Sequence, residues 1–559
     1  MSASLVGSEM CIRDRLYSGD GSLRQIKGRG KTQGNSRKSF TNAKERKGRI
    51  REQESAGQLN NKAKTQNNIS LSKNRIKTEK RHNQRMAKQI QKSTVEKDRI
   101  LPEKLIQDST VWDTIIVGAG AAGMTAALAC GKEKQKVLLL DRQNQMGRKI
   151  LVTGNGKCNL TNFAQKPKYY RSDCPEKVQK VLSVFGQKEA MELFQSLGIY
   201  TKDKNGYVYP YSEQAASVRE AFETEILSNP SITFVPFSEV YNVQKKEDGF
   251  LIKAKEQLGQ SEQSTGKQGN GEKIEKVYRC QSLLITTGGF AGPKFGCDGS
   301  GYAFAKVFGH EIIKPLPALT ALKSSAPFLK KVSGVRNQAE ITLEIDGEPV
   351  KKETGELQWT DYGISGVAIF QLSRFAITAL EEKKKVALYF DFMPELSSKE
   401  KLRLFLMLAQ NHKKRDMFSF VKGLFPAKLC PVILREAGLR EETLAGTLKE
   451  EEWNALVMAV SHFPLRINGY MGYEKAQVTR GGISLTELTG NLESDFQPGL
   501  FFAGEVADVD GTCGGYNLQW AFSSGTVAGR AIVKRNQELF KDDRHTLSLI
   551  HISEPTRLA

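Results

Sequence analysis

Long apolar runs are missing from this chain of 559 residues, and so is a leader of the secretory type. No segment approaches the ~18 consecutive apolar residues that a membrane-spanning helix needs, which predicts a chain without membrane partners. No apolar stretch follows the first charged residues, as it would in a secretory signal. This second absence favours a cytoplasmic location.

Cysteine and histidine are scarce, with eight and six residues respectively. The cysteines are widely spaced and include no CxxC pair, so we expect reduced thiols rather than a disulfide framework. The histidines do not stand near the cysteines at the spacing of zinc ligands. We therefore expect no metal site.

Acidic residues are too few to balance the N-terminal segment. Residues 1–100 contain 25 Lys and Arg but 9 Asp and Glu, whereas the remaining residues contain 58 and 53. The net charge of +21 is therefore concentrated in a polar tail, which is predicted to be disordered over 1–110. Such a tail can be an arm that binds nucleic acid, but we favour a solvated extension or translated sequence upstream of the true start.

The two ends of the chain are related to each other in an unusual way. Residues 3–14 and 547–559 are the translations that opposite strands of one oligonucleotide would give, which resembles a sequencing-library adapter. Folding gives no reason for this relation. We therefore expect residues 1–15 and 547–559 to be adapter-derived and to lie outside the folded domains.

A glycine-rich turn, GAGAAG (118–123), is the first strong motif. A β-branched run precedes it, small residues continue from it into a predicted helix, and the next apolar run ends in Asp141. Gly118 permits the tight turn, Gly120 lets the backbone approach a pyrophosphate, and Gly123 lets the helix pack closely on the strand. Asp141 stands where an acid can bind ribose hydroxyls, which favours NAD or the ADP half of FAD over a ligand with a 2′-phosphate.

The middle of the chain has no second GxGxxG fingerprint, which a reductase with two nucleotide sites would show there. It has instead an apolar strand that ends in Thr287, Gly288 and Gly289. A glycine-rich turn then enters a predicted helix near Gly301. One dinucleotide site per chain is therefore expected.

A further glycine-rich unit, GLFFAGEVADVDGTCGGYNLQWAFSSGTVAGRAIV, occupies 499–533. A short strand is predicted to end at Gly504, and Gly515 to precede a helix from about Tyr516 to Val533. Small residues along this helix suit close packing against a sheet or a cofactor. The N-terminus of the helix can present N–H groups to a flavin ring.

The stretch GRKILVTGNGKCNLTN (147–162) follows the second strand directly, so it is predicted to lie along the cofactor at the carboxyl ends of the strands. Gly154 and Gly156 permit close backbone approach, and the asparagines can both donate and accept hydrogen bonds at a flavin edge. Its Arg and Lys side chains can bind the pyrophosphate. Cys158 has neither a partner thiol nor a visible cause for a lowered pKa, so we expect it to touch the flavin without a redox role.

These motifs, with ITTGG and VTRGGISLTEL, resemble the BaiN/YhiN-like family of FAD-dependent oxidoreductases over roughly residues 111–537. The specific parts are 147–162 and 499–525, because GxGxxG is shared with many families. The resemblance implies an α/β fold with one FAD in a discontinuous Rossmann-type domain, interrupted by a small β-barrel domain that carries a helical insert. Members of the family have been linked to the reduction of conjugated double bonds, as in unsaturated oxo-steroids, and to amine-type oxidation.

The residues expected to bind FAD lie in four stretches of the sequence. They are Gly118, Ala119, Gly120, Ala121, Ala122, Gly123, Asp141, Arg142, Arg148, Lys149, Thr153, Gly154, Asn155, Gly156, Cys158, Asn159, Thr287, Gly288, Gly289, Gly504, Glu505, Gly515, Tyr516, Asn517 and Leu518.

The pattern of apolar and polar residues favours the same division into domains. Alternating apolar and polar stretches after residue 309 suit antiparallel strands, and helical periodicity follows them. We predict an FAD-binding domain at 111–308 and 481–537, a β-barrel-like substrate domain at 309–395 and 462–480, and a helical insert at 396–461.

The predicted function is FAD-dependent oxidoreduction, in which hydride passes through the flavin from NAD(P)H, a transient co-substrate, to a small unsaturated or carbonyl-bearing substrate. Tyr516, Tyr362 and Glu505 are candidate proton donors on residue type alone, and no other catalytic residue is assigned. Two alternatives stay open: a flavin-dependent RNA-modifying enzyme and a non-catalytic flavin-binding sensor. Nucleic acid is the less favoured partner, and the sequence leaves the oligomeric state open.

Overall fold

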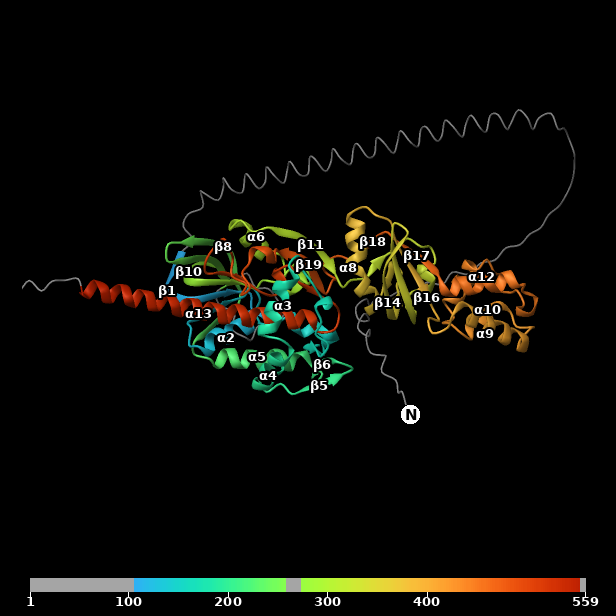
Figure 1. Ribbon diagram of the computed structural model, residues 1–559, viewed down its shortest axis with the longest axis horizontal. Coiled ribbons are helices and arrows are strands. Elements are labelled where there is room, and N and C mark those ends of the chain that lie inside the picture. Colours follow the sequence, from blue (N-terminus) through green and yellow to red (C-terminus); the bar gives the residue numbers. More distant parts are fainter. Residues whose placement is uncertain (1–104, 258–272, 553–559) are drawn as a thin grey trace, which may run out of the picture. The chain divides into compact units, whose positions relative to one another are not determined.

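A computed structural model describes residues 105–257 and 273–552 of the chain (Figure 1). The predicted basic tail lies almost entirely outside the described residues, as do the N-terminal adapter-like segment, the polar loop at 258–272 and residues 553–559. Within the described part of the chain, no helix combines the length and the apolar character that a membrane crossing requires.

A seven-stranded sheet forms the centre of the first core. Its hydrogen-bonded order is β7 (Ile232–Val235), β2 (Val137–Leu140), β1 (Leu105–Val117), β10 (Lys273–Ile285), β9 (Gly249–Gln257) and β8 (Ser238–Lys246), and β20 (Leu500–Phe502) also pairs with β10. Strands β7, β2, β1, β10 and β20 are parallel, whereas β9 and β8 continue as antiparallel strands. All four residues of β2 are buried, as expected for a parallel strand covered on both faces.

Strand β10 is long enough to have two neighbours on one edge. Its first part, as far as Cys280, pairs with β9, and its last residues, Leu283–Ile285, pair with β20. On the other edge β1 follows it from the start, where Leu105 lies opposite Glu275. Strand β1 thus begins inside the segment 1–110 that was predicted to be disordered, because β10 offers backbone partners to these residues.

The helices of the first core within the described residues pack against this sheet and against one another (Figure 1). They are α2 (Ala121–Lys132), α3 (Pro175–Val184), α4 (Gln187–Ser196), α5 (Ala215–Ser228), α6 (Ser300–Val307) and α13 (Tyr516–Ile552). The prediction that helix α13 ends near Val533 is wrong, because the helix continues through Ile552. No glycine or proline follows Val533 within the helix to stop it.

Helices α2 and α13 approach each other closely through glycine. A Cβ at Gly525 would lie 2.2 Å from the carbonyl oxygen of Ala122, and one at Gly529 would lie 2.9 Å from that of Ala126. The small residues of α13, which were expected to face a sheet or a cofactor, therefore face the dinucleotide-motif helix. This contact joins the two ends of the first core.

A second sheet lies between the two halves of the first core in the sequence. Its order is β17 (Phe463–Ile467), β16 (Val386–Asp391), β13 (Arg336–Ile345), β14 (Glu348–Trp359), β15 (Gly363–Ser365), β12 (Leu322–Lys323) and β18 (Gly469–Tyr470), and neighbouring strands are antiparallel. Helices α7 (Leu329–Val332) and α8 (Val367–Glu381) lie between strands of this sheet in the chain. Closure of these strands into a barrel stays a prediction.

Four helices occupy the chain between β16 and β17. They are α9 (Ser398–Asn411), α10 (Met417–Lys422), α11 (Cys430–Glu436) and α12 (Glu450–Ser461). Ser397 caps α9 by accepting the N–H of Glu400. The buried Nζ of Lys401 lies 2.7 Å from both carboxylate oxygens of Asp391, which fixes α9 to the end of β16.

The apolar residues divide into two main clusters. One contains residues from 112–305 and 483–533, and the other contains residues from 316–467. The chain passes between them through β11 (Ile312–Ala318) and β19 (Val478–Ile483), which form an antiparallel pair with Ile312 opposite Ile483. The chain therefore enters and leaves the second core through adjacent strands. The exact domain boundaries stay predictions.

Candidate flavin site

The turn between β1 and α2 uses two of its glycines for packing. Gly118 has a φ of +105°, and a Cβ there would lie 2.6 Å from the carbonyl oxygen of Thr286. A Cβ at Gly123 would lie 1.9 Å from the carbonyl oxygen of Gly118. A side chain at either position would therefore push α2 away from the sheet.

Gly120 differs from these two, because a Cβ there would meet no atom within 4 Å. It precedes Ala121 and Ala122 in the first turn of α2, and among the described residues no side chain caps that turn and no acid lies in it. The first N–H groups of the helix thus have no side-chain partner at the cap, and they carry a partial positive charge. The arrangement fits the pyrophosphate of FAD.

Asp141 ties the end of β2 to this turn. Its Oδ2 accepts the N–H of Ala119 and its Oδ1 accepts that of Gln143, both at 2.7 Å. Burial raises the pKa of this carboxyl group, and the two backbone hydrogen bonds oppose the rise. Asp141 therefore holds the glycine turn in place, in addition to the contact with ribose that we expect of it.

Two of the arginines expected to bind FAD have partners within the protein. Arg142 forms an ion pair with Glu239 at 2.9 Å and another with Asp298. Arg148 donates to the side-chain oxygen of Gln143. Their charges are thus shared with the protein around the site.

Lys149 and Glu505 connect the loop after β2 to the turn after β20. Nζ of Lys149 lies 2.6 Å from Oε2 of Glu505, and Oε1 of Glu505 accepts the N–H of Thr479 at 2.9 Å. Burial acts to lower the pKa of Lys149, but Glu505 and Cys297 together raise it above its usual value. The hydroxyl of Tyr302 is buried nearby with no hydrogen-bond partner among the described residues.

The loop at 147–162 contains a run of left-handed backbone. The short 3₁₀ segment η2 (Ile150–Gly156) breaks at Thr153, and Gly154, Asn155 and Gly156 follow with φ of +54°, +57° and +81°. A Cβ at Gly154 would lie 2.6 Å from the backbone nitrogen of Asn159, whereas the nearest neighbour of one at Gly156 would be the carbonyl oxygen of Leu151, at 3.9 Å. Position 154 therefore favours glycine both for its left-handed backbone and for the lack of room for a side chain. Position 156 favours glycine for its backbone conformation alone.

Asn159 and Asn162 hold this loop against the start of α13. When the amide of Asn159 is oriented so that both its atoms find partners, Nδ2 donates to the carbonyl of Thr161 at 3.0 Å and Oδ1 accepts the N–H of Gly515 at 3.3 Å. Nδ2 of Asn162 donates to the carbonyl of Gly514 at 3.2 Å. These amides, predicted to meet the flavin edge, form bonds within the wall of the site.

The segment after β10 lies beside the first glycine turn. A Cβ at Gly118 would lie 3.1 Å from Cα of Thr287, whose hydroxyl is buried with no partner among the described residues. Gly288 has a φ of +74°, and a Cβ at Gly289 would lie 2.4 Å from Oγ1 of Thr479. The structure thus brings the predicted Thr-Gly-Gly segment next to the dinucleotide motif.

The turn after β20 and the start of α13 form the last part of the candidate flavin site. The N–H of Gly504 donates to Oγ of Ser524 at 2.9 Å, and a Cβ at Gly504 would lie 2.9 Å from Cβ of Ala122. Oδ1 of Asn517 accepts the N–H of Gly511 at 2.8 Å, and Leu518 packs against the first core.

The three candidate proton donors have different surroundings. The hydroxyl of Tyr516 donates to the carbonyl of Ala164 at 2.9 Å, and burial raises its pKa. Glu505 is held in the ion pair with Lys149. Tyr362 lies between β14 and β15 in the second core, where its side chain is 38% exposed. Their assignment as donors stays a hypothesis.

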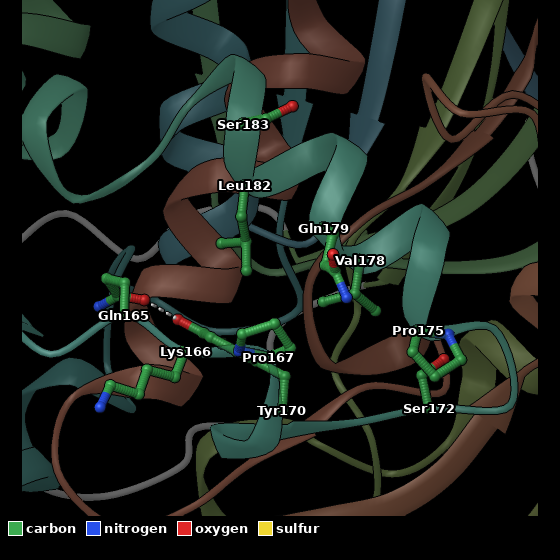
Figure 2. Close-up of a pocket in the computed structure, with 10 residues that line it drawn as sticks. All are labelled: Gln165, Lys166, Pro167, Tyr170, Ser172, Pro175, Val178, Gln179, Leu182 and Ser183. Carbon is green, nitrogen blue, oxygen red and sulfur yellow. Dashed lines mark hydrogen bonds between the residues drawn. The ribbon is translucent and has the colours of Figure 1, made fainter.

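A cleft of about 230 Å³ opens close to the start of α13 (Figure 2). Its wall includes Tyr170 of strand β4 (Tyr170–Arg171) and Val178 and Leu182 of α3. The ring of Tyr170 meets the ring of Tyr516 edge-on, with centroids 5.6 Å apart. The cleft is therefore separated from the start of α13 by one aromatic side chain.

The thiol of Cys158 lies in apolar surroundings. Burial raises its pKa to about 12, so little thiolate exists near neutral pH. The seven cysteines within the described residues are all free, and no group of three or more His, Cys, Asp and Glu residues suits a metal ion there. The raised pKa therefore gives a physical reason for the expectation that Cys158 has no redox role.

We expect Cys158→Ser to retain FAD and most of the activity, because the buried thiol is protonated and a hydroxyl group is of similar size. Gly154→Ala should lower the FAD content, because its Cβ would collide with the backbone of Asn159. Flavin absorbance per protein, measured after desalting, checks both variants. Loss of flavin reduction in Cys158→Ser alone would show that the cysteine matters more than the glycine.

Comparisons with known proteins agree with this geometry. The sequence matches the HI0933-like protein Rossmann domain over residues 112–531. The chain belongs to the HI0933-like family. The resemblance to BaiN/YhiN-like FAD-dependent oxidoreductases is thereby confirmed, and with it the Rossmann-type α/β core of a flavoprotein.

Two curated relatives match over almost their whole length. The 3-dehydro-bile acid delta(4,6)-reductase of Clostridium scindens is 36% identical over 423 residues, which cover 75% of this chain and 98% of the relative. The ribosomal RNA dihydrouridine synthase of Escherichia coli is 30% identical over 427 residues, which cover 76% and 98% respectively.

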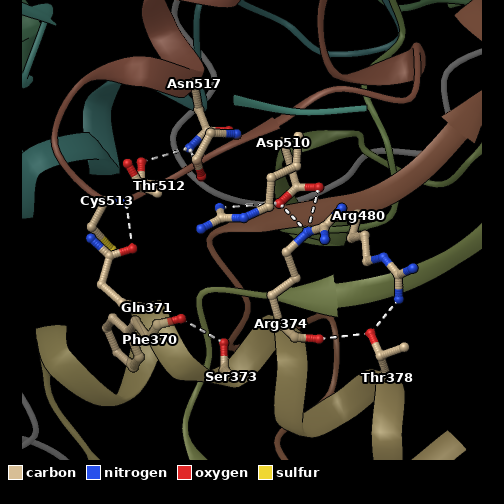
Figure 3. A network of polar contacts seen from close by, with 12 residues as sticks. Phe370, Gln371, Ser373, Arg374, Thr378, Arg480, Asp510, Thr512, Cys513 and Asn517 are labelled. Carbon is tan, nitrogen blue, oxygen red and sulfur yellow. Dashed lines mark hydrogen bonds and ion pairs between the residues drawn. The ribbon is translucent and has the colours of Figure 1, made fainter. Parts of the chain in front are cut away.

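One group of polar residues was not predicted from the sequence. Arg374 pairs with the buried Asp510 at the junction of the two cores, and Arg480 lies near by (Figure 3). Arg171 lies 3.9 Å from the same carboxylate. They come from β4, α8, β19 and β21 (Asp510–Gly511). No local motif links residues so far apart in the chain, and only the tertiary fold brings them together.

Proposed function

We propose that the chain is an FAD-dependent reductase that transfers a hydride from NAD(P)H to a carbon–carbon double bond conjugated to a carbonyl group. The observation that carries the proposal is the match to a curated reductase along 98% of its length. The open space at Gly120 supports it, because a Cβ there would meet no protein atom within 4 Å and a pyrophosphate can approach the backbone. The β-barrel-like second core would supply the substrate-facing wall.

The reaction balances without another oxidant or reductant. NAD(P)H gives up a hydride, one carbon of the double bond receives it, and a proton from the medium or a side chain adds to the other carbon. When bound, FAD supplies the two-electron carrier between the two partners. The chain's part is to hold the pyrophosphate at α2 and to present the positive end of α13 to the site.

The two relatives' names describe related chemistry. A 3-dehydro-bile acid with 4,6-unsaturation and the uracil ring of uridine both have a double bond conjugated to a carbonyl group. A shared reaction on different substrates is therefore the simplest account of the family. It leaves open whether this chain acts on a small molecule or on RNA.

One observation favours RNA as a second candidate substrate. Exposed aromatic side chains flank the hairpin of β5 (Thr201–Lys204) and β6 (Tyr207–Pro210), beside the half-buried Lys202 and Lys204, which pair with Glu213. Tyr200 and Tyr211 are 76% and 63% exposed, and Nζ of Lys202 lies 5.3 Å from the ring centre of Tyr211. Aromatic rings beside lysines suit stacking of unpaired bases and attraction of phosphates.

The test is anaerobic reduction of the full-length holoprotein by NADH and by NADPH, followed by reoxidation with candidate acceptors. We expect one pyridine nucleotide to bleach the flavin absorbance, and a conjugated enone to restore it with formation of the saturated product. Restoration by unmodified ribosomal RNA, with dihydrouridine as the product, would instead select the second candidate. A flavin that no reductant bleaches, or that no acceptor reoxidises, would favour the sensor alternative and contradict the proposal.

A further inference from the structure

The junction of the two cores contains more cations than anions. Arg374 of α8 donates from Nε to both oxygens of Asp510, at 2.9 and 2.8 Å. Arg171 of β4 lies 3.9 Å from Asp510 through NH1, and Arg480 of β19 donates to the hydroxyl of Thr378 (Figure 3). Two guanidinium groups thus pair with one buried carboxylate, and that of Arg480 lies close enough to influence its pKa.

Neighbouring acids do not remove this excess. Glu353 and Glu382, which lie close enough to influence the arginines, pair with lysines at 3.1 and 2.7 Å. Asp508 accepts the N–H of Asp173, and burial raises its pKa to about 6, so near neutral pH it and Asp510 together offset two of the three arginine charges. Burial also lowers the pKa of Arg171 and Arg480, and the nearby Arg374 acts in the same direction. The cluster is therefore short of negative charge.

The arginines retain unused hydrogen-bond donors. A guanidinium group has five N–H donors, and among the described residues Asp510 engages Arg374 through Nε. The side chains of Arg171 and Arg374 are 14% and 18% exposed, so they are neither fully buried nor free in solvent. A small anion can reach them at little cost in side-chain entropy, because Asp510 already fixes their positions.

The cluster lies beside the loop that leads into α13. Asp510 begins that loop, and the N–H of Cys513 within it donates to Oε1 of Gln371 on α8 at 3.2 Å. The guanidinium carbon of Arg171 lies 5.4 Å from the ring centre of Phe375, also on α8. Cationic donors and an apolar ring therefore stand together at the edge of the candidate flavin site.

We propose that Arg171, Arg374 and Arg480 form a subsite for an anionic group of the substrate, either a carboxylate or a phosphate. Arginine suits both groups, because its N–H donors match two oxygens at once. The subsite would hold the charged end of the substrate while its double bond lies at the flavin. The assignment deepens the proposed function and rests on it.

The test compares charged and neutral forms of one substrate in the full-length holoprotein. Arg480→Gln is the main variant, because its side chain leaves the Arg374–Asp510 pair intact. We expect KM for an enone carboxylate to rise about 10- to 100-fold, the range that loss of a hydrogen bond to a charged group gives, with kcat little changed. KM for the matching methyl ester should stay constant. Arg440→Gln, an exposed arginine in the second core, is the control.

A binding measurement separates this proposal from the proposed function. Titration of the oxidised holoprotein with acetate and with inorganic phosphate, at constant ionic strength, should perturb the flavin spectrum of the wild type and the Arg440→Gln protein more than that of Arg480→Gln. A response to acetate alone assigns a carboxylate site, and a response to phosphate alone assigns a phosphate site. Equal responses in all three proteins, or equal losses with acid and ester, would overturn the subsite even if enone reduction occurs.

Discussion

Gly120→Ala is expected to give a folded protein with a clearly weaker affinity for FAD. The backbone at this position is extended, with a φ of −75° and a ψ of −173°, and a Cβ there would touch no protein atom within 4 Å. The new methyl group would instead occupy the space in front of the N–H groups of α2, where the pyrophosphate is expected. Loss of one or two hydrogen bonds to a charged group, at about 1.5–3 kcal/mol each, corresponds to a Kd for FAD at least roughly tenfold weaker.

The measurement is FAD affinity of the apoprotein, by fluorescence titration, with circular dichroism as the check on folding. Gly123→Ala is the contrasting variant, because its Cβ would lie 1.9 Å from the carbonyl oxygen of Gly118 and should damage the fold itself. Gly469→Ala in the second core, where the nearest atom would be 3.6 Å away, should change neither property. Normal FAD affinity in Gly120→Ala would mean that the pyrophosphate lies elsewhere.

Gly525→Ala is expected to lower the free energy of unfolding by several kcal/mol. Its Cβ would lie 2.2 Å from the carbonyl oxygen of Ala122 and 2.4 Å from Oγ1 of Thr125, both on α2. Backbone cannot move aside cheaply, so the helices must separate, and overpacking of this kind costs about 1–3 kcal/mol or more. Separation would also shift α2 relative to β1, so FAD affinity should fall as well.

Urea denaturation of the apoprotein, followed by circular dichroism, measures this effect without interference from FAD. Gly529→Ala should be milder, since its nearest contacts would be 2.9 Å. Lys534→Ala, at a side chain that is 80% exposed on the same helix, should be nearly neutral. Equal stability of Gly525→Ala and the wild type would contradict the close contact between α2 and α13.

Local sequence predicted the parts of the site that local geometry controls. The glycines at 118, 120 and 123 have distinct tasks that follow from backbone sterics, and the structure shows the close contacts at 118 and 123. At 120 it shows open space, and the contact with a pyrophosphate stays a prediction. The apolar run ending at Asp141 predicted the strand, and the structure adds a hydrogen bond from the glycine turn to the carboxylate of Asp141. Such inferences work because all the interacting atoms lie within one βα unit.

Inferences about partners distant in the chain were less complete. The small residues of α13 indicated a close neighbour, but periodicity could not say that the neighbour is α2 rather than a sheet or a cofactor. The asparagines of the 147–162 loop indicated hydrogen bonding, and the structure shows that Asn159 and Asn162 use their amides on Thr161, Gly514 and Gly515. The arginines around Asp510 gave no signal, because a cluster drawn from four separate elements has no spacing to recognise.

The adjacency of β11 and β19 has a consequence for the order of folding. Strand β20 completes the first sheet by pairing with β10, yet the whole second core lies between them in the chain. A flexible connection of that length would oppose the pairing by its loop-closure entropy. A second core that collapses by itself brings its own two ends together, with Ile312 opposite Ile483. The inserted core thereby shortens the effective connection, so its early folding should accelerate assembly of the nucleotide-binding core.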